Sequence, residues 1–410
     1  MKNDASRNIA ELLTRNVEDV IEKKHLTAAL RSGRKLRIKH GIDPTGEKIH
    51  IGRAVQLWKL REFQDLGHKI VLIIGDFTAR VGDPSDKLEK RPMLTREQIR
   101  KNLKNYLPQI GKVLDIKKAE VRYNSEWLDK LSFLETAELA ETFSVNQMLR
   151  RHAFRERFLK NVDISLREFM YPLMQGYDSV AVKADVELGG ADQLFNLQAG
   201  REIQKHYGQK SQDILTTGML SGTDGRKMST SWGNVINIMD TSDEQFGKIM
   251  SMRDSEILNY FRFATRLPLA DIARYEKELA RGANPKDIKM VLGREIVSLY
   301  HGKAAAKAAA EKWEKMFSKR EVSGADLPEL RVPKKILAVD LVLKSGVAKS
   351  KSEAWRLITQ GGLKVGDKAV SNPKQELGFR GGETVRVGKK RFLKISLAVL
   401  HDLARKDGAK

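Results

Sequence analysis

The stretch that decides the fold runs from Gly41 to Arg53 and reads Gly-Ile-Asp-Pro-Thr-Gly-Glu-Lys-Ile-His-Ile-Gly-Arg. A strand-like run at 36–40 precedes it, and an amphipathic helix from about Ile51 to Leu66 follows it. The first N–H groups of such a helix are unpaired, and together with the helix dipole they attract anions. The stretch therefore predicts a phosphate site. An ordinary turn with a polar surface histidine fits the same residues, so the rest of the chain must decide.

The composition limits the class of protein. A chain of 410 residues is long for one core and predicts two to four domains. Its start lacks the apolar core of a secretory signal, and its most apolar run, Ile70 to Ile74, is too short to span a bilayer. The absence of cysteine excludes disulfides, thiolate zinc sites and a cysteine nucleophile. We expect a cytoplasmic protein with no zinc and no membrane contact.

The net charge of +22 is uneven along the chain. Residues 331–410 hold 19 lysines and arginines against 7 acidic residues. A basic region of ordinary hydrophobic content favours a polyanionic partner, nucleic acid before membrane. A solvated basic surface is the alternative interpretation.

Strand-like and helix-like segments alternate through the first 240 residues. Strands are expected at 69–75, 119–123, 185–188 and 214–217, and helices at 95–114 and 190–206. This alternation predicts an α/β fold with a Rossmann-like parallel sheet, whose ligands bind outside the carboxyl ends of the strands. Residues 1–32 and 244–317 follow helical spacing, 327–333 resembles a linker, and the last part predicts a small α+β domain.

A second candidate phosphate site lies at Gly225-Arg-Lys-Met-Ser-Thr-Ser231, after a glycine-rich loop. The common phosphate-loop and dinucleotide fingerprints are absent, so another device must hold any phosphate. A mobile loop with cations and hydroxyls suits a polyphosphate that is gripped and then released. A merely flexible basic loop is the alternative.

Taken together, the two stretches resemble the His-Ile-Gly-His and Lys-Met-Ser-Lys-Ser signatures of class I aminoacyl-tRNA synthetases. Further motifs resemble the bacterial tyrosyl-tRNA synthetase family in particular. The resemblance covers about 33–396, and these further motifs are Gly41-Ile-Asp-Pro-Thr45, Gly75-Asp-Phe-Thr78, Gly82-Asp-Pro-Ser85, Phe169-Met-Tyr-Pro-Leu-Met-Gln-Gly-Tyr-Asp178 and Gly189-Gly-Ala-Asp-Gln193. The resemblance implies a tyrosine–tRNA ligase that uses ATP with Mg²⁺, and no protein nucleophile is needed.

Tyr171, Gln175 and Asp178 have the spacing of one helical face inside an apolar segment. Polar groups in such a place need partners, either in an internal network or in a ligand. The resemblance implies a tyrosine site in which Asp178 accepts from the substrate phenol. It also implies that Tyr171, Gln175 and Asp83 hold the α-ammonium and that Gln193 steers the carboxylate.

The resemblance also implies an ATP site. Thr45, His50, Lys227 and Thr230 would act in catalysis, Gly52 would leave room for the nucleotide, and Asp192 would bind ribose hydroxyls. Met219 and Leu220 would line the adenine, and Lys87 and Arg91 would approach the pyrophosphate. The other expected ATP contacts are Gly41, Asp43, Arg53, Gly190 and Ser229.

Three positions depart from the family pattern. Arg53 replaces the second histidine of the first signature, and Thr230 replaces the second lysine of the second signature. Lys39 lies where many tyrosine enzymes have a tyrosine that contacts the substrate phenol. The hypothesis is an active enzyme with a rearranged cation clamp, in which Arg226, Lys227 or Arg53 compensates for Thr230.

Residues 334–396 resemble the alpha-L RNA-binding module, with Lys349, Lys351, Arg356 and Lys364 as expected phosphate contacts. The resemblance implies tRNA(Tyr) as partner and a homodimer. The expected domains are an N-terminal helical segment at 1–32, the catalytic domain at 33–239, an α-helical anticodon-side domain plus linker at 240–332, the RNA-binding domain at 333–398 and a basic tail at 399–410. The rival interpretations are the tryptophan enzyme of the same fold and a catalytically weakened RNA-binding or regulatory paralogue.

Overall fold

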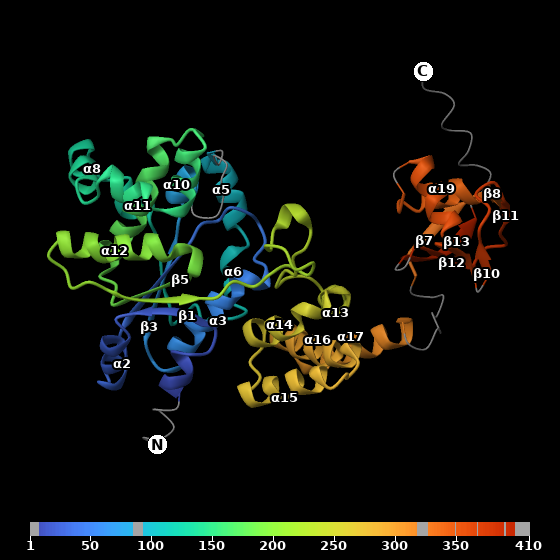
Figure 1. Ribbon diagram of the computed structural model, residues 1–410, viewed down its shortest axis with the longest axis horizontal. Coiled ribbons are helices and arrows are strands. Elements are labelled where there is room, and N and C mark those ends of the chain that lie inside the picture. The colour runs from blue at the N-terminus through green and yellow to red at the C-terminus, as the bar shows by residue number, and fades with distance from the viewer. Residues whose placement is uncertain are drawn as a thin grey trace. The chain divides into compact units, whose positions relative to one another are not determined.

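The computed structural model describes residues 8–84, 93–317, 327–348, 350–366, 368–388 and 391–397. The chain divides into two compact units, Met1–Ala310 and Glu311–Lys410 (Figure 1). The expected contacts of Lys87, Arg91 and Lys349 fall outside the described residues, as does the basic tail. Within the described residues, no helix combines the length and the apolar character needed to cross a membrane.

A six-stranded sheet with the order β1-β6-β5-β2-β3-β4 organises the first unit. Its five parallel strands confirm the predicted α/β class: β2 (Arg37–Ile42), β3 (Lys69–Ile74), β4 (Glu120–Tyr123), β5 (Val186–Gly190) and β6 (Asp213–Thr217). The interior strands β3 and β5, on either side of β2, are almost wholly buried, as expected where helices cover both faces of a parallel sheet.

The edge strand β1 (Val17–Ile21) corrects the prediction of a helical segment at 1–32. Its apolar residues have helical spacing, but left-handed residues at Asn16 and Glu22 interrupt the helix on both sides. The strand pairs antiparallel with β6, with an irregular register between Val17 and Val20. Tertiary pairing therefore overrides the local pattern, and helix α2 (Lys23–Arg31) begins only after the strand.

Helices fill the space around this sheet. Helix α3 (Ile51–Asp65) follows β2, and α11 (Leu166–Val182) packs against α12 (Leu194–His206). The predicted capping box at Thr95 is present, with Gln98 as its partner. The remaining helices up to β6 are α4 (Thr78–Val81), α5 (Arg96–Leu103), α6 (Tyr106–Ile110), α7 (Ser125–Leu128), α8 (Phe133–Ala140), α9 (Val145–Leu149), α10 (His152–Leu159) and the short η1 (Ala191–Gln193).

The helical run predicted for 244–317 is confirmed. It consists of η3 (Asp254–Glu256) and the helices α13 (Ser242–Ser251), α14 (Ile257–Ala264), α15 (Leu269–Ala280), α16 (Pro285–His301) and α17 (Lys303–Phe317). Buried residues of α14 and α16 belong to the same hydrophobic core as those of α3. The helical region up to Ala310 is thus part of the first unit.

The second unit contains a five-stranded sheet with the order β10-β9-β12-β13-β7 and a two-stranded sheet of β8 and β11. The segment predicted as a linker contains strand β7 (Glu329–Val332), which pairs parallel with β13. Its other elements are β8 (Lys335–Leu337), α18 (Ala338–Lys344), α19 (Lys351–Thr359), β9 (Leu363–Val365), β10 (Lys368–Val370), β11 (Glu376–Gly378), β12 (Thr384–Val387) and β13 (Arg391–Leu397).

Candidate active site

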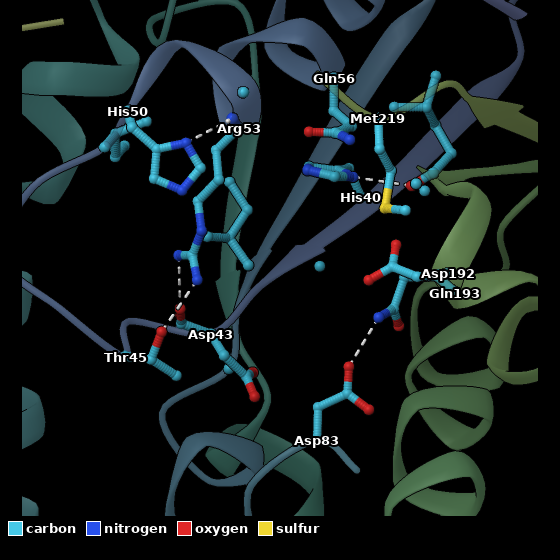
Figure 2. A pocket seen from close by; sticks show the side chains of 18 of the residues that line it. His40, Asp43, Thr45, His50, Arg53, Gln56, Asp83, Asp192, Gln193 and Met219 are labelled. Carbon is cyan, nitrogen blue, oxygen red and sulfur yellow. Dashed lines mark hydrogen bonds between the residues drawn. The ribbon is translucent and has the colours of Figure 1, made fainter. Parts of the chain in front are cut away.

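A cavity of about 770 Å³ opens where β2, β3 and β5 end (Figure 2). The sheet rule predicted this place. The predicted residues that line it are Gly41, Asp43, Thr45, His50, Gly52, Arg53, Asp83, Tyr171, Gln175, Asp178, Gly190, Asp192, Gln193, Met219, Leu220, Lys227, Ser229 and Thr230. Parts of the chain almost 190 residues apart thus meet in one cavity.

His50 is the N-cap of α3, and its Nδ1 accepts a hydrogen bond from the backbone N–H of Arg53 at 3.3 Å. Burial, and then the nearby charge of Arg53, lower the pKa of His50 to about 3. The imidazole is therefore neutral at pH 7, and because Nδ1 accepts, Nε2 carries the proton. His50 presents an uncharged N–H donor beside a helix N-terminus, where negative charge is favoured.

Arg53, the first departure from the family signature, is held by three oxygen atoms. Its Nη1 donates to the hydroxyl of Tyr106 at 2.6 Å and to the backbone oxygen of Asp43 at 3.3 Å. Its Nη2 donates to Thr45 Oγ1 at 2.9 Å. The guanidinium thus fixes the turn at 43–45 while it lines the cavity (Figure 2).

The first signature stretch is hydrogen-bonded to the segment that follows the second one. The backbone N–H of Ile51 donates to Ile236 O at 2.8 Å, and that of Ile238 donates to Ile49 O at 3.0 Å. A Cβ on Gly52 would lie 3.0 Å from the sulfur of Met228, so a side chain at this position would press on the second stretch. A residue larger than glycine would therefore require Met228 and His50 to shift.

The second stretch follows a narrow loop in which Ser221 and Lys227 form an antiparallel bridge. Asn234 braces this loop: its Nδ2 donates to Asp224 Oδ1 at 2.8 Å and to Lys227 O at 3.1 Å, and its Oδ1 accepts from Ser229 N–H at 2.8 Å. The Asn234 side chain, followed by the Arg226 side chain, lowers the pKa of Asp224 to about 2.

Arg226 and Thr230 occupy different surroundings in this loop. Arg226 donates to Asp224 at 2.7 Å, and its guanidinium lies 4.8 Å from the ring centroid of Trp232. Lys227 and Thr230 are exposed side chains that line the cavity. All three cations considered as compensation for Thr230 line the cavity, and Arg226 is in addition held against Asp224 and Trp232.

Asp178 on α11 is buried in the cavity wall. Its carboxylate accepts from the Trp127 indole at 2.7 Å and from Asn124 Nδ2 at 3.4 Å. Burial raises the pKa of Asp178 to about 7, although the charge of Lys39 acts in the opposite direction. The structure thus provides a carboxylate, already aligned by two donors, in contact with the cavity.

Tyr171 connects this wall to the first signature stretch. Its hydroxyl donates to Asp43 Oδ2 at 2.9 Å, and Thr78 Oγ1 donates to Asp43 Oδ1 at 2.7 Å. Burial raises the pKa of Asp43 to about 6. Gly75 makes this possible, because a Cβ there would lie 2.0 Å from Asp43 Oδ1.

Lys39 lies behind the wall, not on it. Its side chain is fully buried, and Nζ contacts Gln175 O and Ser179 Oγ at 2.7 Å and Glu187 Oε1 at 2.8 Å. Lys39 and Glu187 are direct neighbours on the paired strands β2 and β5, which is why the ammonium reaches this carboxylate. A direct contact between Lys39 and a substrate phenol therefore has no support from this geometry.

Several polar residues of the site were not singled out from the sequence. Asn124 and Trp127 hold Asp178, while Glu187 and Asn196 hold the glutamines. Asn124 follows β4 directly, so its place at a strand's carboxyl end was an available signal. Among the described residues no group of three or more His, Cys, Asp or Glu side chains could hold a metal ion.

In the second unit, the expected RNA contacts Lys351 and Arg356 are exposed on α19. Lys364 is half-buried on β9, and in the register of the sheet it lies opposite Arg386 of β12. The exposed ring of Trp355 lies next to Arg356 in the same helix. This unit therefore presents cations and an aromatic side chain to solvent, a combination suited to nucleic acid.

The parallel sheet, the neutral histidine at a helix start and the lysine loop together define a class I aminoacyl-tRNA synthetase. The chain belongs to the tRNA synthetases class I (W and Y), because the model of that family matches residues 31–318. The model of the S4 domain matches residues 339–385. Both matches confirm the family and the RNA-binding module expected from the sequence.

Relatives extend the match to nearly the whole chain. A tyrosine–tRNA ligase of Thermotoga maritima is 46% identical over 388 residues, 94% of this chain and 96% of that protein. One from Moorella thermoacetica is 44% identical over 391 residues, 94% of each chain. The structure of tyrosyl-tRNA synthetase with L-tyrosine from Archaeoglobus fulgidus has a TM-score of 0.60 at 24% identity, covering 74% of this chain and 99% of that one, and supports the fold.

Proposed function

We propose that this chain is a tyrosine–tRNA ligase, which activates L-tyrosine with ATP and transfers it to the 3′ end of tRNA(Tyr). The observation that carries the proposal is the single cavity, lined both by Asp178 and by His50 with Lys227. Tyrosine binding needs an acceptor for the phenol hydroxyl, and ATP binding needs hydrogen-bond donors and a cation for the phosphates. Both sets of groups are present on one surface.

In the first step the tyrosine carboxylate oxygen attacks the α-phosphorus of ATP, which enters as its Mg²⁺ complex. The bond between the α-phosphorus and its bridging oxygen breaks, and pyrophosphate leaves with that electron pair. No protein nucleophile takes part, so catalysis consists of positioning and charge stabilisation. The N–H of neutral His50 and the ammonium of Lys227 stabilise the charge that develops on phosphate oxygens. In the second step a terminal ribose hydroxyl of the tRNA takes the tyrosyl group and releases AMP.

Selection of tyrosine rests on Asp178. Its carboxylate is held by Trp127 and Asn124 and accepts the hydrogen of the substrate phenol. Phenylalanine would leave this buried group without that donor. The free-energy cost of the unpaired group is greatest in a site that excludes water. The family includes both tryptophan and tyrosine enzymes, and the buried carboxylate in the wall favours tyrosine.

The polar groups around the α-carbon are Asp83, Gln175, Gln193 and Tyr171, all on the cavity surface. Asp83 and the oxygen atom of Gln175 suit the α-ammonium, and the amide N–H of Gln193 suits the carboxylate. Asp192 and Met219 are exposed side chains on the nucleotide side and suit the ribose and the adenine.

The basic second unit supports tRNA binding, with Lys351, Arg356 and Lys364 as phosphate contacts. The helices from α13 to α17 form the anticodon-side region of the proposed enzyme. Since its substrates are tRNA and ATP, we assign its work to the cytoplasm.

A homodimer is supported by exposed apolar side chains on α8, α10 and the start of α11. Phe133 is 93% exposed, Leu159 73% and Leu166 79%. Exposed apolar side chains mark an interaction surface where they lie together. Replacement of Phe133 and Leu159 by serine should convert a dimer into a monomer in light scattering, and a wild-type monomer would contradict this part.

Pyrophosphate exchange into ATP, measured separately with tyrosine, tryptophan and phenylalanine, tests the proposed function. We expect exchange with tyrosine, and Asp178→Asn should reduce its kcat/KM about 100-fold. Tryptophan-dependent exchange would point to the sister enzyme. Absence of exchange with any amino acid, together with retained tRNA binding, would point to an RNA-binding paralogue.

A further inference from the structure

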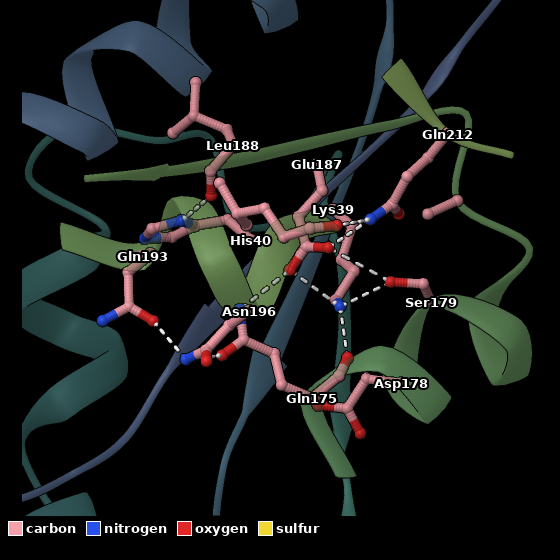
Figure 3. A network of polar contacts seen from close by, with 12 residues as sticks. Lys39, His40, Gln175, Asp178, Ser179, Glu187, Leu188, Gln193, Asn196 and Gln212 are labelled. Atoms are coloured by element: carbon pink, nitrogen blue, oxygen red, sulfur yellow. Dashed lines mark hydrogen bonds and ion pairs between the residues drawn. The ribbon is translucent and has the colours of Figure 1, made fainter. Parts of the chain in front are cut away.

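One side of the cavity is formed by Tyr171, Gln175 and Asp178 and is called the amino-acid wall below. A continuous chain of hydrogen bonds runs behind and along it (Figure 3). It begins at the buried Lys39–Glu187 ion pair. Gln175 Nε2 donates to Glu187 Oε1 at 3.1 Å, and Gln175 Oε1 accepts from Asn196 Nδ2 at 3.0 Å. The same Asn196 Nδ2 donates to Gln193 Oε1 at 2.9 Å.

The chain continues to the cavity surface. Gln193 Nε2 donates to Asp83 Oδ2 at 2.7 Å, and Arg151 Nη2 donates to Asp83 Oδ1 at 3.3 Å. A carboxylate therefore stands at each end of the amide series, with Asn196 between the two glutamines. Asn196 is fully buried on α12 and is not among the residues that line the cavity.

The carboxylates and Asn196 determine which way each carboxamide faces. Ionised carboxylates only accept, so the NH₂ groups of both glutamines must face Glu187 and Asp83. Their oxygen atoms must then face Asn196, whose NH₂ group has two hydrogens and supplies one to each. A reversed glutamine would set oxygen against oxygen at the carboxylate and NH₂ against NH₂ at Asn196. Asn196 is the one member that holds both glutamines at once.

We propose that Asn196 is a positioning residue that fixes the carboxamide orientations of Gln175 and Gln193 and thereby sets the polarity of the amino-acid site. The inference rests on the proposed function. With this orientation Gln193 keeps its NH₂ group on the Asp83 side, so that Asp83 accepts from one N–H and the other is a donor for the substrate carboxylate. Gln175 keeps its oxygen as an acceptor, as an ammonium group needs. Asn196 does this without touching the substrate.

Substitution of Asn196 by aspartate tests this directly. Aspartate has nearly the same shape but cannot donate from the Nδ2 position, so both glutamines must turn round or face an acceptor. In pyrophosphate exchange at pH 8 with the full chain, Asn196→Asp should raise the KM for tyrosine about 100-fold, while the KM for ATP stays within about two-fold. Asn196→Ala removes the donor without adding an acceptor and should raise the KM for tyrosine about 10-fold.

Which of the two variants has the larger increase in the KM for tyrosine distinguishes a role in orienting the glutamines from a role in packing. A packing role would make the smaller alanine more harmful to tyrosine binding than the isosteric aspartate. Gln245→Glu is the control, because Gln245 is a buried amide of α13 that donates to the backbone oxygen of Asn237, does not line the cavity and has no hydrogen bond to this network among the described residues. It should leave the KM for tyrosine within about two-fold.

Three outcomes overturn the inference: alanine as harmful as aspartate or more so, equal changes in both KM values, or no change in either variant. If Asn196→Asp does not fold, the ratio of the two KM values in Asn196→Ala decides alone. Wild-type exchange with tyrosine keeps the proposed function in place whatever the variants do. A wild-type chain without exchange overturns both.

Discussion

The amino-acid wall and the loop at 221–231, called the phosphate loop below, belong to the same cavity but hold their polar groups in different ways. In the wall, Asp178, Tyr171 and Gln175 are fixed by side chains from other elements, including the buried Lys39 and Asn196. In the loop, Lys227 and Thr230 are exposed, and the described anchors act mostly on the backbone. Tyr260 donates to Ser221 O, and Asn234 bridges Lys227 O and Ser229 N–H.

This difference matches two different tasks. Discrimination between amino acids that differ by one hydroxyl requires acceptors that cannot move to suit the wrong ligand. A group that grips a polyphosphate must let the product leave, so an exposed side chain on a loop suits it. Substitutions in the wall should therefore change stability and tyrosine affinity, and those in the loop should change the rate alone.

The largest effect on stability is expected at the buried Lys39–Glu187 ion pair, which lies behind the amino-acid wall. Lys39→Met leaves Glu187 buried without its cation and should lower the free energy of unfolding by about 3–5 kcal/mol. Urea denaturation measures this. Adding Glu187→Gln removes the stranded charge and should recover most of the loss. A single variant as stable as wild type would mean that the wall does not depend on this pair.

The loop gives the next largest effect. Lys227→Ala removes an exposed cation from the phosphate side and should reduce the rate of tyrosine activation about 100-fold. Its denaturation midpoint should not move, because the side chain is exposed. Arg226→Ala is the comparison in the same loop: that guanidinium also lines the cavity, but it is ion-paired with Asp224 and contacts Trp232, so its removal should reduce the rate less. Equal losses of rate in both variants would contradict the distinction between these two cations.

A smaller effect follows from the pKa of Asp178, which burial raises to about 7 from an ordinary 3.8. The folded protein then binds this proton more tightly than the unfolded chain, so the contribution to stability is present at low pH and lost as pH rises through 7. Wild type should therefore lose stability relative to Asp178→Asn between pH 5 and pH 8. An unchanged difference would show that Asp178 titrates normally.

The same titration should appear in binding. A neutral carboxyl accepts more weakly than a carboxylate, so the KM for tyrosine should rise about 10-fold from pH 8 to pH 6. The KM of Asp178→Asn should stay flat over this range. A parallel rise in the variant would assign the titration to another group.

The smallest effect is expected at Thr230. Lysine at this exposed position restores the cation of the family signature and should raise the activation rate about three-fold. Stopped-flow measurement of adenylate formation gives this rate. If Thr230→Lys leaves the rate unchanged, the idea that the cation clamp is rearranged around this position fails.

Sequence patterns predicted the sheet and the cavity because these depend on local signals. Strand alternation, the capping box at Thr95 and the two signature stretches are each contained in one short segment. The lining residues could be predicted from motifs for the same reason. The strand at Val17 to Ile21 was missed because its pairing partner β6 lies almost 200 residues away.

Residues behind the lining were harder to predict. Lys39 faces Glu187 only because β2 and β5 adopt one register among several. Asn196 belongs to no motif and touches no ligand in the proposed reaction, so only the orientation of Gln175 and Gln193 reveals it. Side chains that act through other side chains belong to no motif of fixed spacing, so the sequence alone does not reveal them.

The two outer strands of the first sheet have a consequence for the protein at high concentration. An unpaired strand edge can recruit the edge of another molecule and start aggregation. Strand β1 has acidic residues Glu18 and Asp19 and an irregular register, and β4 carries the ion-paired Glu120 and Arg122. The charges on both strands and the irregular register of β1 disfavour edge-to-edge stacking, so we expect the folded protein to resist aggregation at high concentration.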